Sequence, residues 1–341
     1  MIRVVSIFVS FLIACGVCWA GTQNRIGLSS FKVSDYPDMS IVVSVTDKTT
    51  SATVKGLKPS DFTITIDGSP QPDAVVESVL SGGRKIALAM LVDTSGSMKG
   101  VPLQSAKQAI IEMLDRLSAS DRASVIGFSD RVRSGKDYTT DRVQLRSELT
   151  NLKSSGETAL FDAVVRACES VTKEDCDRKV VVALSDGKDN SSAISYAECL
   201  RRVEASGVSV YTIGLGRDIT ETQLQEIASK SGGRYFAAAT ATDLQSIYQS
   251  IAENLQNQYV VELSAPASFK PGNWHELGVT LGDASGKAGF MTAVADKSNL
   301  SSAGSSGTTV NTLQVVIGSL AAANILAIGT YLLRRRKHKT L

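Results

Sequence analysis

Four short runs of apolar residues are separated by segments with helical periodicity, and this alternation restricts the fold more than any other feature of the chain. The runs cover residues 86–92, 123–128, 180–184 and 208–215. Between the first two runs, apolar residues recur at spacings of three and four, as on one face of a helix: Leu103, Ala106, Ile110, Leu114 and Leu117. Strands that are apolar on both faces need cover on both faces. The pattern therefore predicts a doubly wound α/β domain with a mostly parallel sheet.

The segments on either side of this region have the period-two pattern of strands. Residues 41–45 and 62–66 alternate, and an Asp67-Gly68 turn signal follows. After a last helix at about residues 243–256, we expect strands at 259–263, 274–281 and 288–294. Because three strands alone are marginally stable, segments 30–84 and 258–295 are expected to pair into one β-sandwich. The α/β domain, residues 85–257, would then be inserted between them.

The two ends of the 341-residue chain have the patterns of targeting and anchoring segments. Residues 1–20 show the charged, apolar and small-residue order of a secretory signal peptide, which predicts cleavage near Ala20. Residues 12–16 also resemble a bacterial lipobox, and on that alternative Cys15 becomes a lipid-bearing N-terminus.

Near the other end, residues 313–333 carry no formal charge and are long enough to cross a hydrocarbon core of about 30 Å as a helix. The basic tail, residues 334–341, predicts that the C-terminus is cytoplasmic. Residues 296–312 are rich in Ser, Gly and Thr, which favours a flexible tether.

The net charge of +2 depends on the two ends, since Arg3 and the five Lys and Arg residues of the tail supply six positive charges. The remainder is mildly acidic and has no basic stripe, which argues against nucleic-acid binding. Three cysteines lie between the ends, namely Cys168, Cys176 and Cys199. An odd number permits one disulfide and one free thiol, and we expect Cys168 to pair with Cys176. Their spacing does not match a zinc site.

Five residues with side-chain oxygens follow strands or precede a helix on three loops. Asp93, Ser95 and Ser97 follow the first apolar run, Asp186 follows run 180–184, and Thr158 precedes a helix expected from about residue 159. Ligands of open α/β sheets bind at the carboxyl ends of the strands. Oxygen donors with few carboxylates suit Mg²⁺, Mn²⁺ or Ca²⁺ better than zinc. Gly96 is expected to allow the tight turn that brings Ser95 and Ser97 toward one ion.

These residues resemble the metal-ion-dependent adhesion site of the von Willebrand factor A domain family, in which Asp-x-Ser-x-Ser is joined by a Thr and an Asp from two later loops. The resemblance covers about residues 85–257, and segments 45–47, 57–62, 227–236 and 258–259 look like secreted bacterial members. It implies that Ser95 and Ser97 bind the ion directly and that Thr158 joins them in a ligand-bound state. Asp93 and Asp186 would coordinate directly or through water.

The resemblance implies a bacterial interaction module with its exterior domain in the periplasm or outside the cell, held by one helix in the cytoplasmic membrane. A protein ligand would offer an Asp or Glu carboxylate to the metal. The alternative is a scaffold subunit of an envelope complex.

Enzyme activity is disfavoured because the exterior part holds a single histidine, His275, in a distant segment, so Ser95 and Ser97 have no evident base. Gly214 and Gly216 make only half of a dinucleotide-binding fingerprint. Metal-dependent hydrolysis is the less favoured alternative.

Overall fold

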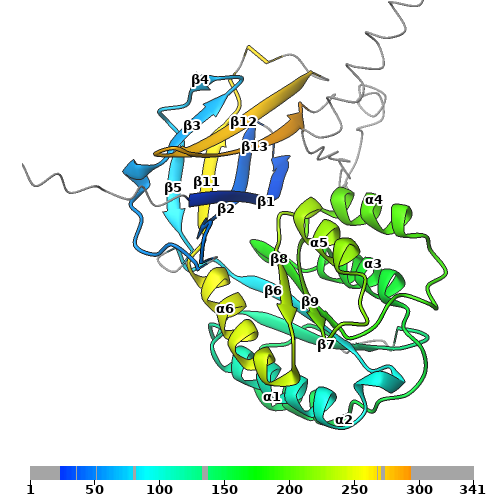
Figure 1. The fold of residues 1–341 in the computed structure, drawn as a ribbon. Coiled ribbons are helices and arrows are strands. Elements are labelled where there is room, and N and C mark those ends of the chain that lie inside the picture. Colours follow the sequence, from blue (N-terminus) through cyan, green and yellow to red (C-terminus); the bar gives the residue numbers. More distant parts are fainter. Residues whose placement is uncertain are drawn as a thin grey trace, which may run out of the picture.

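The computed structural model describes residues 24–35, 37–50, 52–79, 82–132, 137–266, 268–269 and 273–292. These residues form an α/β domain and a β-sandwich (Figure 1). The expected signal peptide 1–20, with Cys15 and Ala20, lies outside the described residues, as do tether 296–312, helix 313–333 and tail 334–341. Within the described residues, every helix is too short or too polar to span a bilayer.

The α/β domain contains a five-stranded parallel sheet, which confirms the predicted fold class. The strands lie in the order β10-β9-β8-β6-β7. Their bounds are β6 (Ile86–Asp93), β7 (Arg122–Phe128), β8 (Arg178–Ser185), β9 (Ser209–Leu215) and β10 (Tyr235–Ala238). Strands β6 and β9 are buried at every residue, as their unbroken apolar runs predict. The edge strand β10 is not among the four apolar runs.

Three helices cover each face of this sheet. Alternate residues of β6 point to opposite faces, so Leu88 and Met90 join one core while Ala87 and Ala89 join the other. One face packs on α1 (Val101–Asp115), α2 (Arg142–Asn151) and α6 (Leu244–Gln256). The other packs on α3 (Leu160–Val171), α4 (Tyr196–Ser206) and α5 (Glu221–Lys230).

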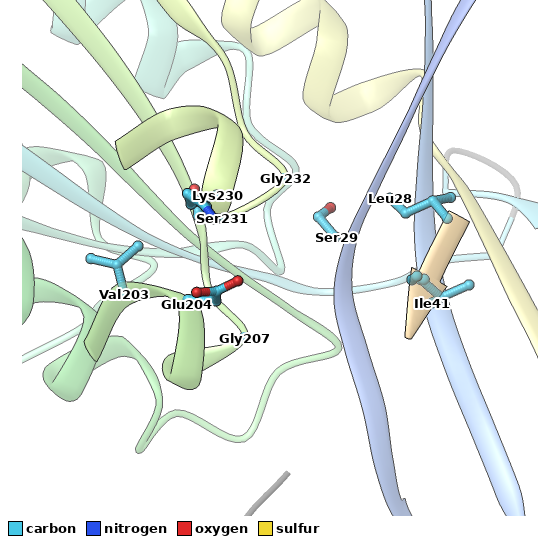
Figure 2. A pocket seen from close by; sticks show the side chains of 10 residues that line it. Leu28, Ser29, Ile41, Val203, Glu204, Gly207, Lys230, Ser231 and Gly232 are labelled. Atoms are coloured by element: carbon cyan, nitrogen blue, oxygen red, sulfur yellow. The ribbon is translucent and has the colours of Figure 1, made fainter. Parts of the chain in front are cut away.

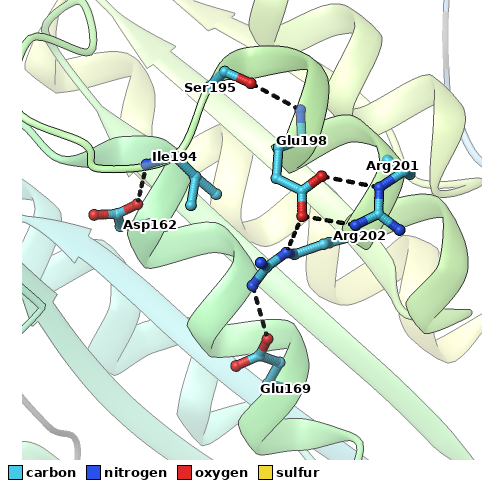
Figure 3. Close-up of polar contacts among 7 residues, drawn as sticks. All are labelled: Asp162, Glu169, Ile194, Ser195, Glu198, Arg201 and Arg202. Carbon is cyan, nitrogen blue, oxygen red and sulfur yellow. Dashed lines mark hydrogen bonds and ion pairs between the residues drawn. The ribbon is translucent and has the colours of Figure 1, made fainter.

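Polar contacts fix α4 against α3, as Figure 3 shows. Asp162 of α3 accepts hydrogen bonds from the backbone N–H groups of Ala193 at 2.9 Å and Ile194 at 3.1 Å, just before α4 begins. Further along, Arg202 of α4 forms an ion pair with Glu169 of α3 at 3.6 Å. These contacts tie α4 to the helix that follows the Thr158 loop.

The sandwich has two four-stranded sheets in the orders β1-β2-β11-β5 and β13-β12-β3-β4. Strand β11 follows the α/β domain in sequence yet lies between β2 and β5, which precede it, and β12 pairs with β3 in the same way. The predicted insertion of the α/β domain between flanking β segments is confirmed. The first sheet has β1 (Asn24–Asp35), β2 (Asp38–Asp47), β5 (Val75–Ser78) and β11 (Tyr259–Ser264). The second has β3 (Thr63–Ile66), β4 (Ser69–Pro70), β12 (Trp274–Leu281) and β13 (Ala284–Met291).

Two strands differ from the sequence-based expectation. The strand predicted at residues 288–294 begins at Ala284, because Gly282 adopts a φ of 54° and lets Leu281 pair with Ala284 across a two-residue turn. Strand β1 begins at Asn24, ahead of the expected segment 30–84. Its few apolar residues, such as Ile26, left no strong alternation to detect.

The expected disulfide is wrong, since Cys168, Cys176 and Cys199 are all free thiols. Cys168 points from α3 into the core that it shares with Cys199 of α4, whereas Cys176 is only partly buried beside that core. Burial raises the pKa of both Cys168 and Cys199 to about 12. The loop after α3 therefore does not turn Cys176 back onto Cys168.

The two domains meet where β1 of the sandwich lies against the loop between α5 and β10. Figure 2 shows Ser29 facing Gly232 across this interface, while the Leu28 side chain points the other way, toward Ile41 of the sandwich. Gly232 has a φ of 71°, and a Cβ added there would lie 2.3 Å from the Leu28 carbonyl oxygen and 2.6 Å from Ser29 Cβ. Only glycine permits this backbone contact.

A second tie lies where the chain passes between the domains. Arg178 at the start of β8 is fully buried and donates to the Leu255 carbonyl oxygen at 2.7 Å and to Gln258 Oε1. The Gln258 carbonyl oxygen accepts from the Val79 N–H at 2.9 Å. The sandwich is thus attached at the amino ends of the parallel strands.

We predict that Gly232→Ala destabilises the protein by about 2–4 kcal/mol, because the methyl group adds a backbone clash to the strain of positive φ. Gly56→Ala is the matched control: its φ is 73°, but a Cβ there meets nothing within 4 Å. The control should lose about 1 kcal/mol. Urea-induced unfolding measures both losses, and equal losses would refute the proposed tight contact between the domains.

Candidate functional site

Three loops at the carboxyl end of the parallel sheet bring together the residues predicted to bind a metal. The first loop follows β6 and carries Ser95 and Ser97, the second precedes α3 and carries Thr158, and the third follows β8 and carries Asp186. Asp93 is the last residue of β6 itself. Because β6 and β8 are adjacent parallel strands, their carboxyl ends place Asp93 and Asp186 side by side.

Backbone hydrogen bonds lock the first loop against the second. The Gly96 N–H donates to the Gly156 carbonyl oxygen at 2.9 Å, and the Ser155 N–H donates to the Thr94 carbonyl oxygen at 2.7 Å. Thr94 is fully buried and holds β7 in turn, because its N–H and its hydroxyl both donate to the Phe128 carbonyl oxygen. The loop positions are therefore set by the main chain.

Hydrogen bonds connect four of the five predicted residues. Asp93 accepts from the Ser95 N–H at 2.8 Å. The hydroxyls of Ser95 and Ser97 are 3.0 Å apart, and the Ser97 hydroxyl donates to Asp186 Oδ1 at 2.8 Å. Asp93 and Ser95 are buried, Asp186 is half-buried and Ser97 is exposed, so the group opens to solvent on the Ser97 side.

Thr158 lies against the same group from the second loop. It is 4% exposed, and its hydroxyl oxygen is 3.4 Å from the position of a Cβ on Gly187, next to Asp186. Asn190 accepts a hydrogen bond from the Thr158 N–H at 2.9 Å, and its own N–H donates to the Thr158 carbonyl oxygen at 3.0 Å. The structure thus brings all five side chains to one place, which we call the oxygen cluster: Asp93, Ser95, Ser97, Thr158 and Asp186.

The oxygen cluster holds two carboxyl groups that no basic side chain of the described chain neutralises. Asp93 accepts hydrogen bonds only from neutral groups, the Ser95 N–H and the Ser185 hydroxyl at 2.6 Å. Burial raises the pKa of Asp93 to about 6, and the charge of Asp186 adds to the rise. Burial likewise raises the pKa of Asp186, despite the hydrogen bond from Ser97.

This donor set fits a hard divalent cation. Two carboxylates balance its charge, three hydroxyls add neutral oxygen ligands, and the cluster contains no sulfur or imidazole. Among the described residues, no group of three or more His, Cys, Asp or Glu could hold a metal ion elsewhere. A cation here would depend on the hydroxyls as much as on the carboxylates.

Gly96 begins the short 3-10 turn η2 (Gly96–Met98), across which the hydroxyls of Ser95 and Ser97 come within 3.0 Å, and it does so without positive φ. A glycine with positive φ lies in the second loop. Gly156 has a φ of 84°, and a Cβ there would lie 2.9 Å from Asp130 Oδ1. Gly156 thus lets the second loop pass close to the chain that follows β7.

Sequence reasoning missed Ser185, whose hydroxyl donates to the buried Asp93. A serine just before Asp186 was the only available signal. Asp189 of the third loop caps α3, since it accepts from the Phe161 N–H in the first turn of that helix at 2.9 Å. His275 lies in β12 of the sandwich, hydrogen-bonded to Asp67 at 2.7 Å.

Comparison with known proteins matches residues 87–250 to the model of the von Willebrand factor type A domain. The inter-alpha-trypsin inhibitor heavy chain H4 of Bos taurus is 25% identical over 196 residues, which is 52% of this chain but only 21% of that protein. The chain therefore corresponds to about a fifth of that relative's length. The domain match supports a protein-interaction role.

Two solved structures are similar at low identity. A von Willebrand factor type A protein from Catenulispora acidiphila is 14% identical, with a TM-score of 0.48, over 80% of this chain and 74% of that chain. Proximal thread matrix protein 1 from the mussel byssus, with a zinc-occupied MIDAS motif, is 21% identical, with a TM-score of 0.47, over 56% of this chain and 49% of that chain. At TM-scores below 0.5, neither likeness bears on what this chain binds.

We predict that Asp93→Asn raises the free energy of unfolding at pH 8 by about 1–3 kcal/mol when a chelator is present, because an amide has no charge to desolvate. The amide can still accept from the Ser95 N–H and can donate to the Ser185 hydroxyl. The folded-state pKa of about 6 lies above the ordinary value of 3.8, so the wild-type protein gains stability as the pH falls through 6. The gap between the two proteins should therefore close near pH 4.

Urea-induced unfolding at pH 8 and pH 4.5 with EDTA measures this gap. Asp73→Asn, at an exposed carboxylate of the sandwich, is the control and should show no gain. A destabilised Asp93→Asn variant at pH 8, or a gap that is the same at both pH values, would contradict the prediction.

Proposed function

Because residues 87–250 match the model of the von Willebrand factor type A domain, we propose that this chain captures a protein partner through a divalent cation held at the oxygen cluster. The cation would be Mg²⁺, with Mn²⁺ or Ca²⁺ as alternatives, and the partner would offer an Asp or Glu side chain. One observation carries the proposal: two carboxyl groups share a chain of hydroxyls and have no basic partner in the described residues.

Each residue of the oxygen cluster would have a distinct part in holding the cation. Asp93 and Asp186 supply the negative charge, while Ser95, Ser97 and Thr158 supply neutral oxygens. Since the hydroxyls add no charge, a bound cation would retain enough positive charge to attract a further carboxylate from outside. The exposure of Ser97 and the half-burial of Asp186 leave that approach open.

We propose a binding rather than a catalytic role for this site. A hydrolase would need a base to activate water, whereas on this proposal both carboxylates of the oxygen cluster serve as ligands of the cation. His275 belongs to the other domain and pairs with Asp67.

We also propose that the chain is anchored in a bacterial cytoplasmic membrane with its domains outside. The support is the sequence alone: the uncharged segment 313–333, the basic tail 334–341 and the signal-like residues 1–20.

We predict that the purified protein binds Mg²⁺ and that Ser97→Ala weakens this binding by at least about tenfold, since one oxygen ligand is lost. Ser120→Ala is the matched control. The Ser120 hydroxyl also lies 3.1 Å from that of a serine two residues away, Ser118, but it precedes β7 at the amino end of the sheet. Isothermal titration calorimetry measures both affinities.

Partner capture tests the second half of the proposal. Envelope proteins retained by the wild-type protein in Mg²⁺ should be lost with EDTA and lost with Asp186→Ala, but retained with Ser120→Ala. Absence of cation uptake, or capture that ignores both EDTA and Asp186→Ala, would refute the proposed function.

A further inference from the structure

A hollow lies beside the oxygen cluster and follows the carboxyl end of the sheet toward β10. Ser97 and Asp186 line it at one end. Leu215, Ala239 and Ala241, from the ends of β9 and β10, line it further along, together with Pro102 at the start of α1. We call it the side hollow. Because the strand order is β10-β9-β8-β6, the side hollow begins at the predicted metal ligands and runs across two further strands.

Arg217 lines the side hollow on the loop after β9. It is exposed, and no residue in the described part of the chain forms an ion pair or hydrogen bond with its guanidinium group. The acidic neighbour Asp218 pairs instead with Lys188 at 3.4 Å. The side hollow therefore has small and apolar walls together with the carboxyl groups of Asp186 and Asp218. Asp218 is paired with Lys188, whereas Arg217 is a cation without a partner among the described residues.

The guanidinium group of Arg217 is complementary to an acidic side chain of a bound chain segment. A guanidinium group presents paired N–H donors that match the two oxygens of a carboxylate. The small side chains of Ala239 and Ala241 leave room for an extended backbone.

We propose that Arg217 is a specificity-determining residue that selects partners with two acidic side chains. On the proposed function, on which this inference rests, one carboxylate of the partner approaches the cation at the oxygen cluster. The second carboxylate of the same segment pairs with Arg217, and the residues between them lie in the side hollow.

The sheet geometry sets the spacing of the two acidic residues. Arg217 follows β9, which neighbours β8, and adjacent strands are about 4.8 Å apart. An arginine side chain extends the reach by several ångströms, whereas an extended segment advances about 3.3–3.6 Å per residue. Side chains two residues apart also project from the same face. We therefore place the second acidic residue two or three positions from the first.

Biotinylated peptides test this proposal directly. Each peptide has a Gly/Ser/Ala background and one Glu, and the series adds a second Glu at two, three or six positions away, or a Lys at two positions away. Binding of the whole protein is measured in Mg²⁺ and in EDTA. The peptides with Glu pairs at spacings of two or three should bind about threefold to tenfold more tightly than the single-Glu and six-position peptides in Mg²⁺.

Charge reversal supplies the decisive comparison. Arg217→Glu should abolish the preference for the second Glu and favour the peptide with Lys, while its Mg²⁺ affinity by calorimetry stays unchanged. Arg217→Lys should keep the preference in weaker form. Arg131→Glu is the matched control, since Arg131 is exposed at the carboxyl end of the sheet but follows β7 on the opposite side of the oxygen cluster. It should keep the wild-type ranking.

The two levels of the proposal fail in different ways. If Mg²⁺-dependent binding occurs but the peptide ranking is the same in the wild-type and Arg217→Glu proteins, the role of Arg217 is refuted and the proposed function stands. If no peptide binds in a Mg²⁺-dependent way and the protein takes up no cation, the proposed function and this inference both fail.

Discussion

A buried carboxylate without a basic partner is the constraint on which the rest of this site depends. Asp93 ends a strand inside the sheet and is shielded from solvent, and within the described part of the chain its hydrogen bonds come from neutral groups of Ser95 and Ser185. Ionising such a group costs free energy, and the nearby Asp186 increases that cost. Because the fold holds Asp93 and Asp186 side by side, it creates a negative site that attracts a cation from solution.

The fold places this charge at the end of the sheet that is remote from the sandwich. The inter-domain passages lie at the amino ends of the strands, where Arg178 contacts Leu255 and Gln258 (Figure 1). Asp93 lies at the other end of β6, an eight-residue strand, which corresponds to about 25 Å. Attachment at one end therefore leaves the opposite end free for a partner.

The contacts between the domains favour a fixed relative orientation. Gly232 lets the backbone of β1 touch the loop between α5 and β10. Arg178 holds the outgoing passage at Leu255 and Gln258 from inside the α/β domain. Each sheet of the sandwich combines strands from before and after the inserted domain, since β11 pairs with β2 and β5 and β12 pairs with β3. The sandwich therefore cannot form without the chain segments on both sides of the α/β domain. The oxygen cluster is thus presented on a scaffold in which the two domains depend on each other.

The sequence by itself determined the elements whose burial leaves a periodic trace. Unbroken apolar runs predicted β6, β7, β8 and β9 of the parallel sheet, and alternation predicted β2 and β3. The order of these segments predicted the insertion of one domain into the other. The spacing of Asp93, Ser95 and Ser97 likewise marked them as one unit, because residues on one short loop cannot separate.

Only the tertiary structure decided contacts between residues that are distant in the chain. It joined Ser185 to Asp93 and placed Cys168 in the same core as Cys199. It also turned Asp218 toward Lys188, so that Arg217 has no partner among the described residues. It further required positive φ at Gly156 and Gly232, where loops pass close to other parts of the chain. Local patterns record which face of an element is buried, but they do not record which partner fills the space across it. That choice depends on packing among segments that the sequence keeps far apart.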